Sequence, residues 1–121
     1  MKNRKPVSTK KTAGSLPALT SLSTTEEVRA RGPRMAILPV GATEQHGGHL
    51  PLVTDSLVID AVAQVVAQEL GAYCLPVLPF SISHMHRGQI GTVWLRNETL
   101  QLVIRRGEDL LNIRLSIGDG L

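Results

Sequence analysis

The feature that most constrains the fold is an unbroken apolar run that leads straight into a loop of polar and ionisable residues. The run Met35–Val40 (MAILPV) lies between Pro33 and Gly41. Continuous apolar runs of this length are typical of a parallel strand that is buried on both faces. The connection that follows, residues 41–54, holds three glycines and a proline. The sequence therefore predicts a buried first strand that ends at a polar loop.

A helix is expected next, capped by Asp55 or Ser56 and ending at Leu70, with Gly71 as its stop. The apolar residues that recur at helical spacing in this segment are Leu57, Val58, Ala61, Val62, Val65, Val66 and Ala67. A shorter helix is expected upstream, beginning at Glu26 after a Thr24 or Thr25 cap and ending at Gly32 and Pro33.

The same order of strand, loop and helix then recurs. Tyr73–Phe80 (YCLPVLPF) predicts a second strand, and its two prolines indicate an irregular or edge position. A polar loop covers residues 81–91, residues 92–95 are a short strand candidate, and a helix is expected from an Asn97 cap to about Leu111. This alternation predicts an α/β fold, a three-layer α/β/α arrangement with a mostly parallel sheet of perhaps three strands.

The basic charge of the chain comes from its N-terminus. Five of the 13 Lys and Arg residues lie in the first 11 positions, which leaves 8 against all 10 acids beyond them. We therefore expect residues 1–17 to be a disordered basic tail and residues 18–121 to form the folded domain. The stretch Met1 to Thr25 is also weakly similar to a transit peptide. No clustered basic face is visible beyond the tail, so nucleic-acid binding is not expected.

The composition also indicates the compartment and the core. With 2% aromatic residues, any core must be built from Val, Leu, Ile and Ala. The single cysteine, Cys74, excludes an internal disulfide, fits a reducing compartment and predicts a cytoplasmic protein. No apolar run approaches the roughly 18 residues of a membrane span, so no membrane partner is expected.

Glu44, His46 and Asp55 are the strongest candidates for chemistry. Residues two apart in an extended segment project to the same side, and the loop is long enough to bring Asp55 back to them. Two carboxylates and one imidazole suit zinc or manganese, and a bridging carboxylate can hold two cations about 3.5–4 Å apart. The alternative is that Glu44 and His46 are solvated loop residues and Asp55 is only a helix cap.

Residues 36–55, AILPVGATEQHGGHLPLVTD, resemble the signature of the creatininase (creatinine amidohydrolase) family. In that family a buried strand runs into Glu-Gln-His-Gly-x-His-Leu-Pro-Leu-x-Thr-Asp. The resemblance continues at residues 78–80 and 83–92, where the family usually has a Ser-x-Glu-His segment leading to Pro-Gly-Thr. In all it covers about Leu19 to Arg106, which is the N-terminal half of such a protein.

The resemblance implies a metal-dependent amidohydrolase that acts on a cyclic amide or formamide C–N bond through a metal-activated water. Glu44 and His46 would each bind one of two Zn or Mn ions, and Asp55 would bridge them. His49 would pack the loop or support the ligands from behind. Ser83, His84 and His86 would belong to the substrate pocket or to a polar loop. A small-molecule amide substrate and a homo-oligomer, hexameric in creatininase, are also implied.

Three departures from the family pattern limit what carries over. Gly48 stands where the family often has proline, and Met85 and Ile90 replace the usual Glu and Pro of the second loop. The chain also ends at Leu121 before the Asn-Gly-His loop that supplies a further ligand, and residues 107–121 read like a frame-shifted tail. The alternative expectation is therefore a non-catalytic, truncated remnant with an incomplete metal site.

Overall fold

The computed structural model describes residues 16–110. Its elements are α1 (Thr25–Arg31), β1 (Ala36–Ile37), α2 (Thr54–Leu70), β2 (Tyr73–Cys74), the 3-10 helix η1 (His84–His86) and α3 (Asn97–Leu110). The order of helix and strand is the one that the sequence predicts. The expectation of a disordered tail at residues 1–17 and of an altered C-terminal end falls almost wholly outside the described residues.

Helix α1 forms where a capping box allows it. The Thr24 hydroxyl accepts a hydrogen bond from the Glu27 amide, and the Glu27 carboxylate accepts one from the Thr24 amide. These contacts lower the pKa of Glu27, chiefly through the bond from the Thr24 amide. Gly32 ends the helix in the left-handed conformation, with φ of 53°. The predicted short helix is confirmed at both ends.

The two predicted strands pair in parallel, but their regular part is much shorter than expected. Ala36 lies opposite Tyr73, and an isolated bridge pairs Val40 with Leu78 farther along. Four steps along the first segment thus match five along the second, as at a β-bulge. Pro39, Pro76 and Pro79 have no amide N–H to donate, so the hydrogen-bond ladder is interrupted at each of them.

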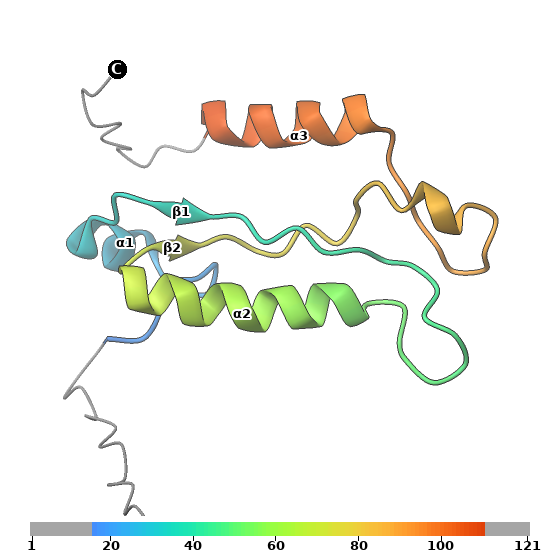
Figure 1. Cartoon of the computed structure of the whole chain (residues 1–121). Coiled ribbons are helices and arrows are strands. Elements are labelled where there is room, and N and C mark those ends of the chain that lie inside the picture. The colour runs from blue at the N-terminus through green and yellow to red at the C-terminus, as the bar shows by residue number, and fades with distance from the viewer. Residues whose placement is uncertain (1–15, 111–121) are drawn as a thin grey trace, which may run out of the picture.

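The expectation that Met35–Val40 is buried on both faces is wrong. Met35 is 48% exposed and Leu38 is 37% exposed. The reason lies in the layers: α2 packs against one side of β1 and β2, whereas α3 lies on the opposite side without burying these side chains (Figure 1). Leu19 pairs with the other edge of β2, so β2 lies between Leu19 and β1 and is not an edge strand at Tyr73.

Helix α2 contacts the strands through a narrow stripe of small residues. Its buried residues are Ser56, Ala63 and Ala67, and the core cluster joins Ala63 and Ala67 to Ala72 and Cys74. Small side chains let the helix backbone lie close to the strands. The contact is therefore densely packed, although the buried area is small.

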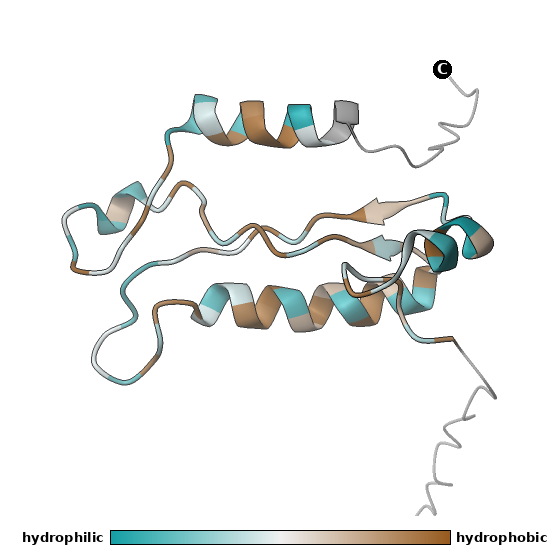
Figure 2. Ribbon diagram, turned by 180° about the vertical axis from the view of Figure 1, so that it is seen from behind, coloured by the Kyte–Doolittle hydropathy of each residue, from teal (hydrophilic) through white to brown (hydrophobic). Residues whose placement is uncertain are grey.

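Most of the larger apolar residues of α2 lie outside this stripe. Of the seven residues at helical spacing in the sequence, only Ala67 is buried, and the other six are exposed. In Figure 2 hydrophobic and hydrophilic bands alternate along α2. No helix within residues 16–110 is both long and apolar enough to cross a membrane.

Both polar loops reach the same end of the molecule, beyond the carboxyl ends of the strands (Figure 1). Residues 92–95, a short strand candidate in the sequence, form isolated bridges there. The Val93 amide donates to the Thr43 carbonyl at 2.9 Å, and the Leu95 amide donates to the Ser81 carbonyl at 2.9 Å. This segment therefore ties the continuations of both strands together and holds the two loops side by side.

The buried thiol of Cys74 offers a test of this core. Cys74 is 2% exposed, and burial, followed by the charge of Asp60, raises the pKa of its thiol. Because the thiolate is the reactive form, we expect labelling by a thiol reagent to be slow in the folded chain and fast after denaturation. The chain has one cysteine, so the signal is unambiguous. Equal labelling rates with and without denaturant would contradict the packing of α2 on β2.

Candidate functional site

The position of Asp55 depends on how α2 begins. The helix starts at Thr54, and Val53 at its N-cap makes no side-chain capping bond. The expectation that Asp55 or Ser56 caps the helix is therefore wrong. The Thr54 amide and hydroxyl both donate to the Pro51 carbonyl, at 3.1 and 2.6 Å, and start the helix without either residue. Asp55 lies in the first turn with its carboxylate available for other contacts.

Ser56 fixes this first turn against the end of the first strand segment. Its hydroxyl donates to the Ala42 carbonyl at 3.0 Å. A Cβ atom at Gly41 would lie 2.6 Å from the Cα atom of Ser56, so only glycine fits there without displacing the backbone. Asp55, the neighbour of Ser56, is thereby placed close to Glu44.

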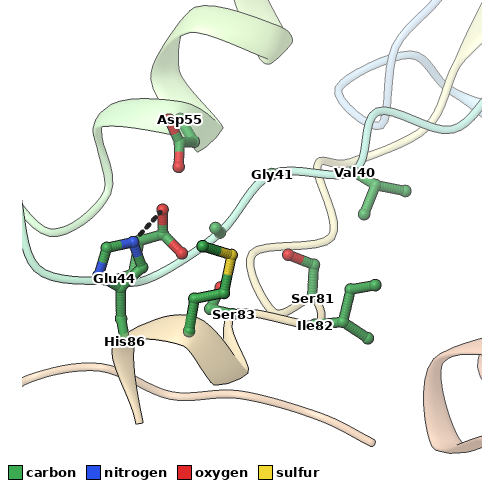
Figure 3. Close-up of a pocket in the computed structure, with 10 residues that line it drawn as sticks. Val40, Gly41, Glu44, Asp55, Ser81, Ile82, Ser83 and His86 are labelled. Carbon is green, nitrogen blue, oxygen red and sulfur yellow. Dashed lines mark ion pairs between the residues drawn. The ribbon is translucent and has the colours of Figure 1, made fainter. Parts of the chain in front are cut away.

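Glu44, His46 and Asp55 meet as the sequence predicts. One ligand atom from each lies within 4.8 Å of the others, and all three residues are half-buried. Figure 3 shows the Asp55 carboxylate projecting from α2 toward that of Glu44. Among the described residues this is the one group of at least three His, Cys, Asp or Glu side chains with metal-ligand spacing. Its oxygen and nitrogen donors are those that zinc and manganese accept.

The orientation of His46 leaves one ring nitrogen for a cation. Nδ1 lies 3.0 Å from the Glu44 carbonyl, which can only accept, so Nδ1 carries the proton. In the neutral ring Nε2 then presents a lone pair 3.3 Å from Oδ1 of Asp55. Two electron-rich atoms at this distance repel unless a proton or a metal ion lies between them.

The pKa of His46 reports the same electrostatics. It is raised above its ordinary value, first by the bond to the Glu44 carbonyl and then by the charge and hydrogen bond of Asp55, against partial desolvation. The site therefore stabilises positive charge at Nε2 of His46, where a metal ion would bind.

The second loop brings His86 to the same place. His86 ends η1, and its Nε2 lies 3.8 Å from Oε1 of Glu44, the contact drawn as a dashed line in Figure 3. Its Nδ1 lies 2.9 Å from Nε2 of Gln45. Gln45 in turn is held at the end of the second loop, because its backbone N–H donates to the Thr92 hydroxyl at 3.1 Å. The two loops are thus linked by side chains as well as by the strand-like bridges.

A pocket of about 340 Å³ opens beside the carboxylates. Its wall contains Glu44, Asp55 and His86 together with the small and apolar residues Val40, Gly41, Ala42, Ser81, Ile82, Ser83 and Met85. The hydroxyl of Ser83 is buried and has no hydrogen-bond partner among the described residues. A ligand in the pocket would find this unpaired hydroxyl available.

Two histidines singled out in the sequence lie away from the cluster. His49 is exposed, and the structure describes no hydrogen bond or ion pair for it. It therefore does not support the proposed ligands from behind. His84 is also exposed, and its ring packs against Trp94 with centroids 6.5 Å apart. The structure therefore places Ser83 and His86 at the pocket and leaves His49 and His84 outside it.

Sequence reasoning missed Gln45, Gly41 and Ser56. Gln45 lies between two candidate ligands, so in an extended segment its side chain should point away from them. The sequence gives no sign that it contacts a residue 41 positions along the chain. Gly41 was read only as the end of a strand and Ser56 only as a cap. Nothing in the sequence alone marks the contact between Gly41 and Ser56, because the burial of Ser56 is seen only in the structure.

Comparison with known proteins identifies relatives of this chain. The sequence profile named Creatininase and described as creatinine amidohydrolase matches residues 21–109. A protein of Mycolicibacterium smegmatis named mycofactocin precursor peptide peptidase is 38% identical over 88 residues, which are 68% of this chain and 35% of that protein.

Solved structures give the same result. A mutant creatininase described as Zn-Zn type has a TM-score of 0.64 and 32% identity, and the match covers 78% of this chain and 42% of that one. A manganese creatininase has a TM-score of 0.63 and 31% identity, covering 76% and 41%. The chain thus spans about a third of the length of the curated relatives that it matches.

Replacing Gly41 by alanine should disturb the site through backbone contact alone. The added methyl group would meet the Cα atom of Ser56 at 2.6 Å, so α2 must move away from the strand segment. Overpacking of this kind costs about 1–3 kcal/mol, which chemical denaturation should detect. Gly48→Ala is the matched control, because a Cβ atom there has open space around it. Equal stability of the two variants would exclude the close contact.

The two buried serines should respond in opposite ways to alanine. Ser56→Ala leaves the Ala42 carbonyl without its 3.0 Å donor and should lower the free energy of unfolding by about 1–3 kcal/mol. Ser83→Ala removes a hydroxyl that has no partner, so the free energy of unfolding should stay the same or rise. Denaturation midpoints check both, and a destabilising Ser83→Ala would mean that its hydroxyl is bonded.

Proposed function

Because this chain belongs to the creatininase family, we propose that Glu44, His46 and Asp55 hold divalent zinc or manganese in a hydrolase of amide C–N bonds. The observation that carries the proposal is the cluster of one imidazole and two carboxylates with ligand atoms within 4.8 Å. The Zn-Zn and Mn forms of the related creatininases support the choice of metal.

The donor set fits a cation for an electrostatic reason. The carboxylates of Glu44 and Asp55 and the lone pair of His46 converge, and in this arrangement they repel one another. A metal ion replaces that repulsion with attraction. The Nδ1–H bond of His46 to the Glu44 carbonyl keeps the ring in the tautomer whose Nε2 can bind metal. Asp55, in the first turn of α2, is the proposed bridge between two cations.

The pocket gives each neighbouring residue a role toward substrate. When bound, the cations lower the pKa of a water molecule and stabilise negative charge on an attacked carbonyl oxygen. Glu44 and Asp55 lie in the wall of the pocket, so an amide placed there would be next to them. The Ser83 hydroxyl can bond a polar atom of the substrate, while Ile82 and Met85 offer apolar contact.

The proposed substrate class is a small molecule with a cyclic amide or formamide bond. A peptide amide is the second candidate within the same chemistry, because similar relatives are named peptide peptidases. Met85 stands where the family often has glutamate, which makes this part of the pocket less polar. A homo-oligomer, implied by the family resemblance, and a cytoplasmic location, expected from the single cysteine, complete the proposal.

A second candidate function is a non-catalytic chain with an incomplete metal site. A catalytic zinc usually takes three protein ligands, so two cations need more than three side chains. Within residues 16–110 the cluster has three, and the nearby Nε2 of His86 remains 3.8 Å from Glu44. This geometry favours weak or single occupancy in the chain by itself.

Metal content tests the proposal directly. The chain is loaded with zinc or manganese, dialysed and measured by elemental analysis. We expect the wild type to retain metal and Asp55→Asn to lose it. Loss of a partner behind a ligand lowers metal affinity about 10–100-fold, so loss of a ligand should lower it at least as much. Retention should also fall at acid pH, because the raised pKa of His46 keeps a proton on the ring.

Asp60→Asn is the matched control, since Asp60 is on the same helix, bonds the Gln64 side chain and is not part of the cluster. It should retain metal like the wild type. An empty wild type would refute the metal site, and equal retention by the Asp55 and Asp60 variants would assign the metal elsewhere. A loaded chain that cleaves no amide from a panel of cyclic amides, formamides and peptides would establish the non-catalytic alternative.

A further inference from the structure

We infer that Gln45 is a positioning residue that fixes the tautomer of His86, so that His86 presents its N–H side to the carboxylate of Glu44. The inference rests on the proposed function for its consequence, since Glu44 is a proposed metal ligand. Its structural part depends only on hydrogen bonds that the metal-free chain already makes.

The direction of the Gln45 amide is set by a backbone group that can only donate. The Gly47 N–H donates to Oε1 of Gln45 at 3.1 Å. Gly47 has φ of 70°, a left-handed conformation that glycine adopts readily, and its N–H turns back toward the Gln45 side chain. Oε1 is therefore engaged, and the NH₂ group of Gln45 must be the end that faces His86.

The proton on His86 follows from this direction. Nε2 of Gln45 lies 2.9 Å from Nδ1 of His86 and has protons to donate, so Nδ1 must accept through its lone pair. A neutral imidazole carries one proton, which then belongs to Nε2. Nε2 is the atom that lies 3.8 Å from Oε1 of Glu44. The distance is too long for a direct hydrogen bond, so the contact is electrostatic or bridged by water.

The tautomer matters because Glu44 has little room to avoid its neighbour. The Glu44 side chain is 17% exposed and that of His86 is 35% exposed, so solvent screens the pair only in part. With the proton on Nε2, His86 attracts the carboxylate and holds it in place. With the proton on Nδ1, a lone pair would face the carboxylate and repel it. Gln45 thus determines whether His86 supports or opposes the orientation of a proposed ligand.

The anchoring of Gln45 makes this arrangement reproducible. The backbone N–H of Gln45 donates to the Thr92 hydroxyl at 3.1 Å. Thr92 is itself held in a turn, because its backbone N–H donates to the Gln89 carbonyl. Gln45 is therefore tied to both loops, by Gly47 on one side and by His86 and Thr92 on the other. A residue that only filled space would need none of these contacts.

Gln45→Glu is the sharpest test, because it keeps size and shape while replacing the NH₂ donor with an oxygen that can only accept. Histidine ring ¹⁵N shifts are measured on the metal-free chain at a pH where His86 is neutral in the wild type. Comparison with His86→Asn assigns the signals. We expect an unprotonated Nδ1 in the wild type, and an Nδ1 that gains a proton in Gln45→Glu.

Two further variants separate this effect from charge and from misfolding. Gln89→Glu adds the same charge on the second loop and should leave the wild-type pattern intact. Gln45→Met removes the donor without adding charge, and His86 should then shift toward the tautomer mixture of the exposed His49. A protonated Nδ1 in the wild type, or an unchanged His86 in both Gln45 variants, would overturn the inference.

Metal retention provides the second readout. Gln45→Met, which adds no charge beside the ligands, should weaken metal binding by about 10–100-fold, the usual effect of changing a partner of a metal ligand. Retention equal to that of the wild type, despite a changed tautomer, would overturn the link from His86 to Glu44. A wild type that takes no metal would instead refute the proposed function, while the tautomer assignment would be judged on the metal-free spectra alone.

Discussion

The close contact between the first turn of α2 and the end of the first strand segment is the constraint on which the rest of the site depends. Gly41 has no side chain, so the backbone of Ser56 can approach it, and the Ser56 hydroxyl bonds the Ala42 carbonyl. This contact holds the first turn of α2 against the strand segment, while the bonds of Thr54 to the Pro51 carbonyl start the helix. Asp55 then faces Glu44 because it precedes Ser56 in the same turn, and no capping bond competes for its carboxylate. Packing of the smallest residues thus produces the electrostatic centre.

That centre is costly for the metal-free chain. Carboxylates and an imidazole lone pair converge within 4.8 Å, and the pKa of His46 is raised first by its bond to the Glu44 carbonyl and then by the charge of Asp55. Stability alone would favour separating such groups. The fold instead holds them together through backbone contacts, with the Glu44 carbonyl orienting His46. A site that is unfavourable when empty and favourable around a cation is the arrangement expected of a metal ligand set.

Sequence reasoning succeeded where local signals are strong. The capping residues around Thr24 and Gly32 bounded α1, Gly71 ended α2, and a long loop motif brought Glu44, His46 and Asp55 together. It failed where distant segments decide the outcome. Helical spacing predicts a helix at α2, but it cannot tell which of several valines and alanines faces the strands. Nor can it show that prolines shorten the regular sheet, or that Gln45 contacts His86 across 41 residues.

The short ladder has a consequence for how the site keeps its shape. Regular pairing is confined to Ala36–Ile37 and Tyr73–Cys74, and the segments that approach the site are joined mainly by single bridges and side-chain bonds. The Thr43 hydroxyl donates to the Pro79 carbonyl at 2.9 Å and is one of these side-chain bonds. Each such bond is worth only about 0.5–1.5 kcal/mol, so no single one secures the loops. The precision of the site must therefore arise from several polar contacts acting together, which makes residues such as Gln45 and Thr92 part of its construction.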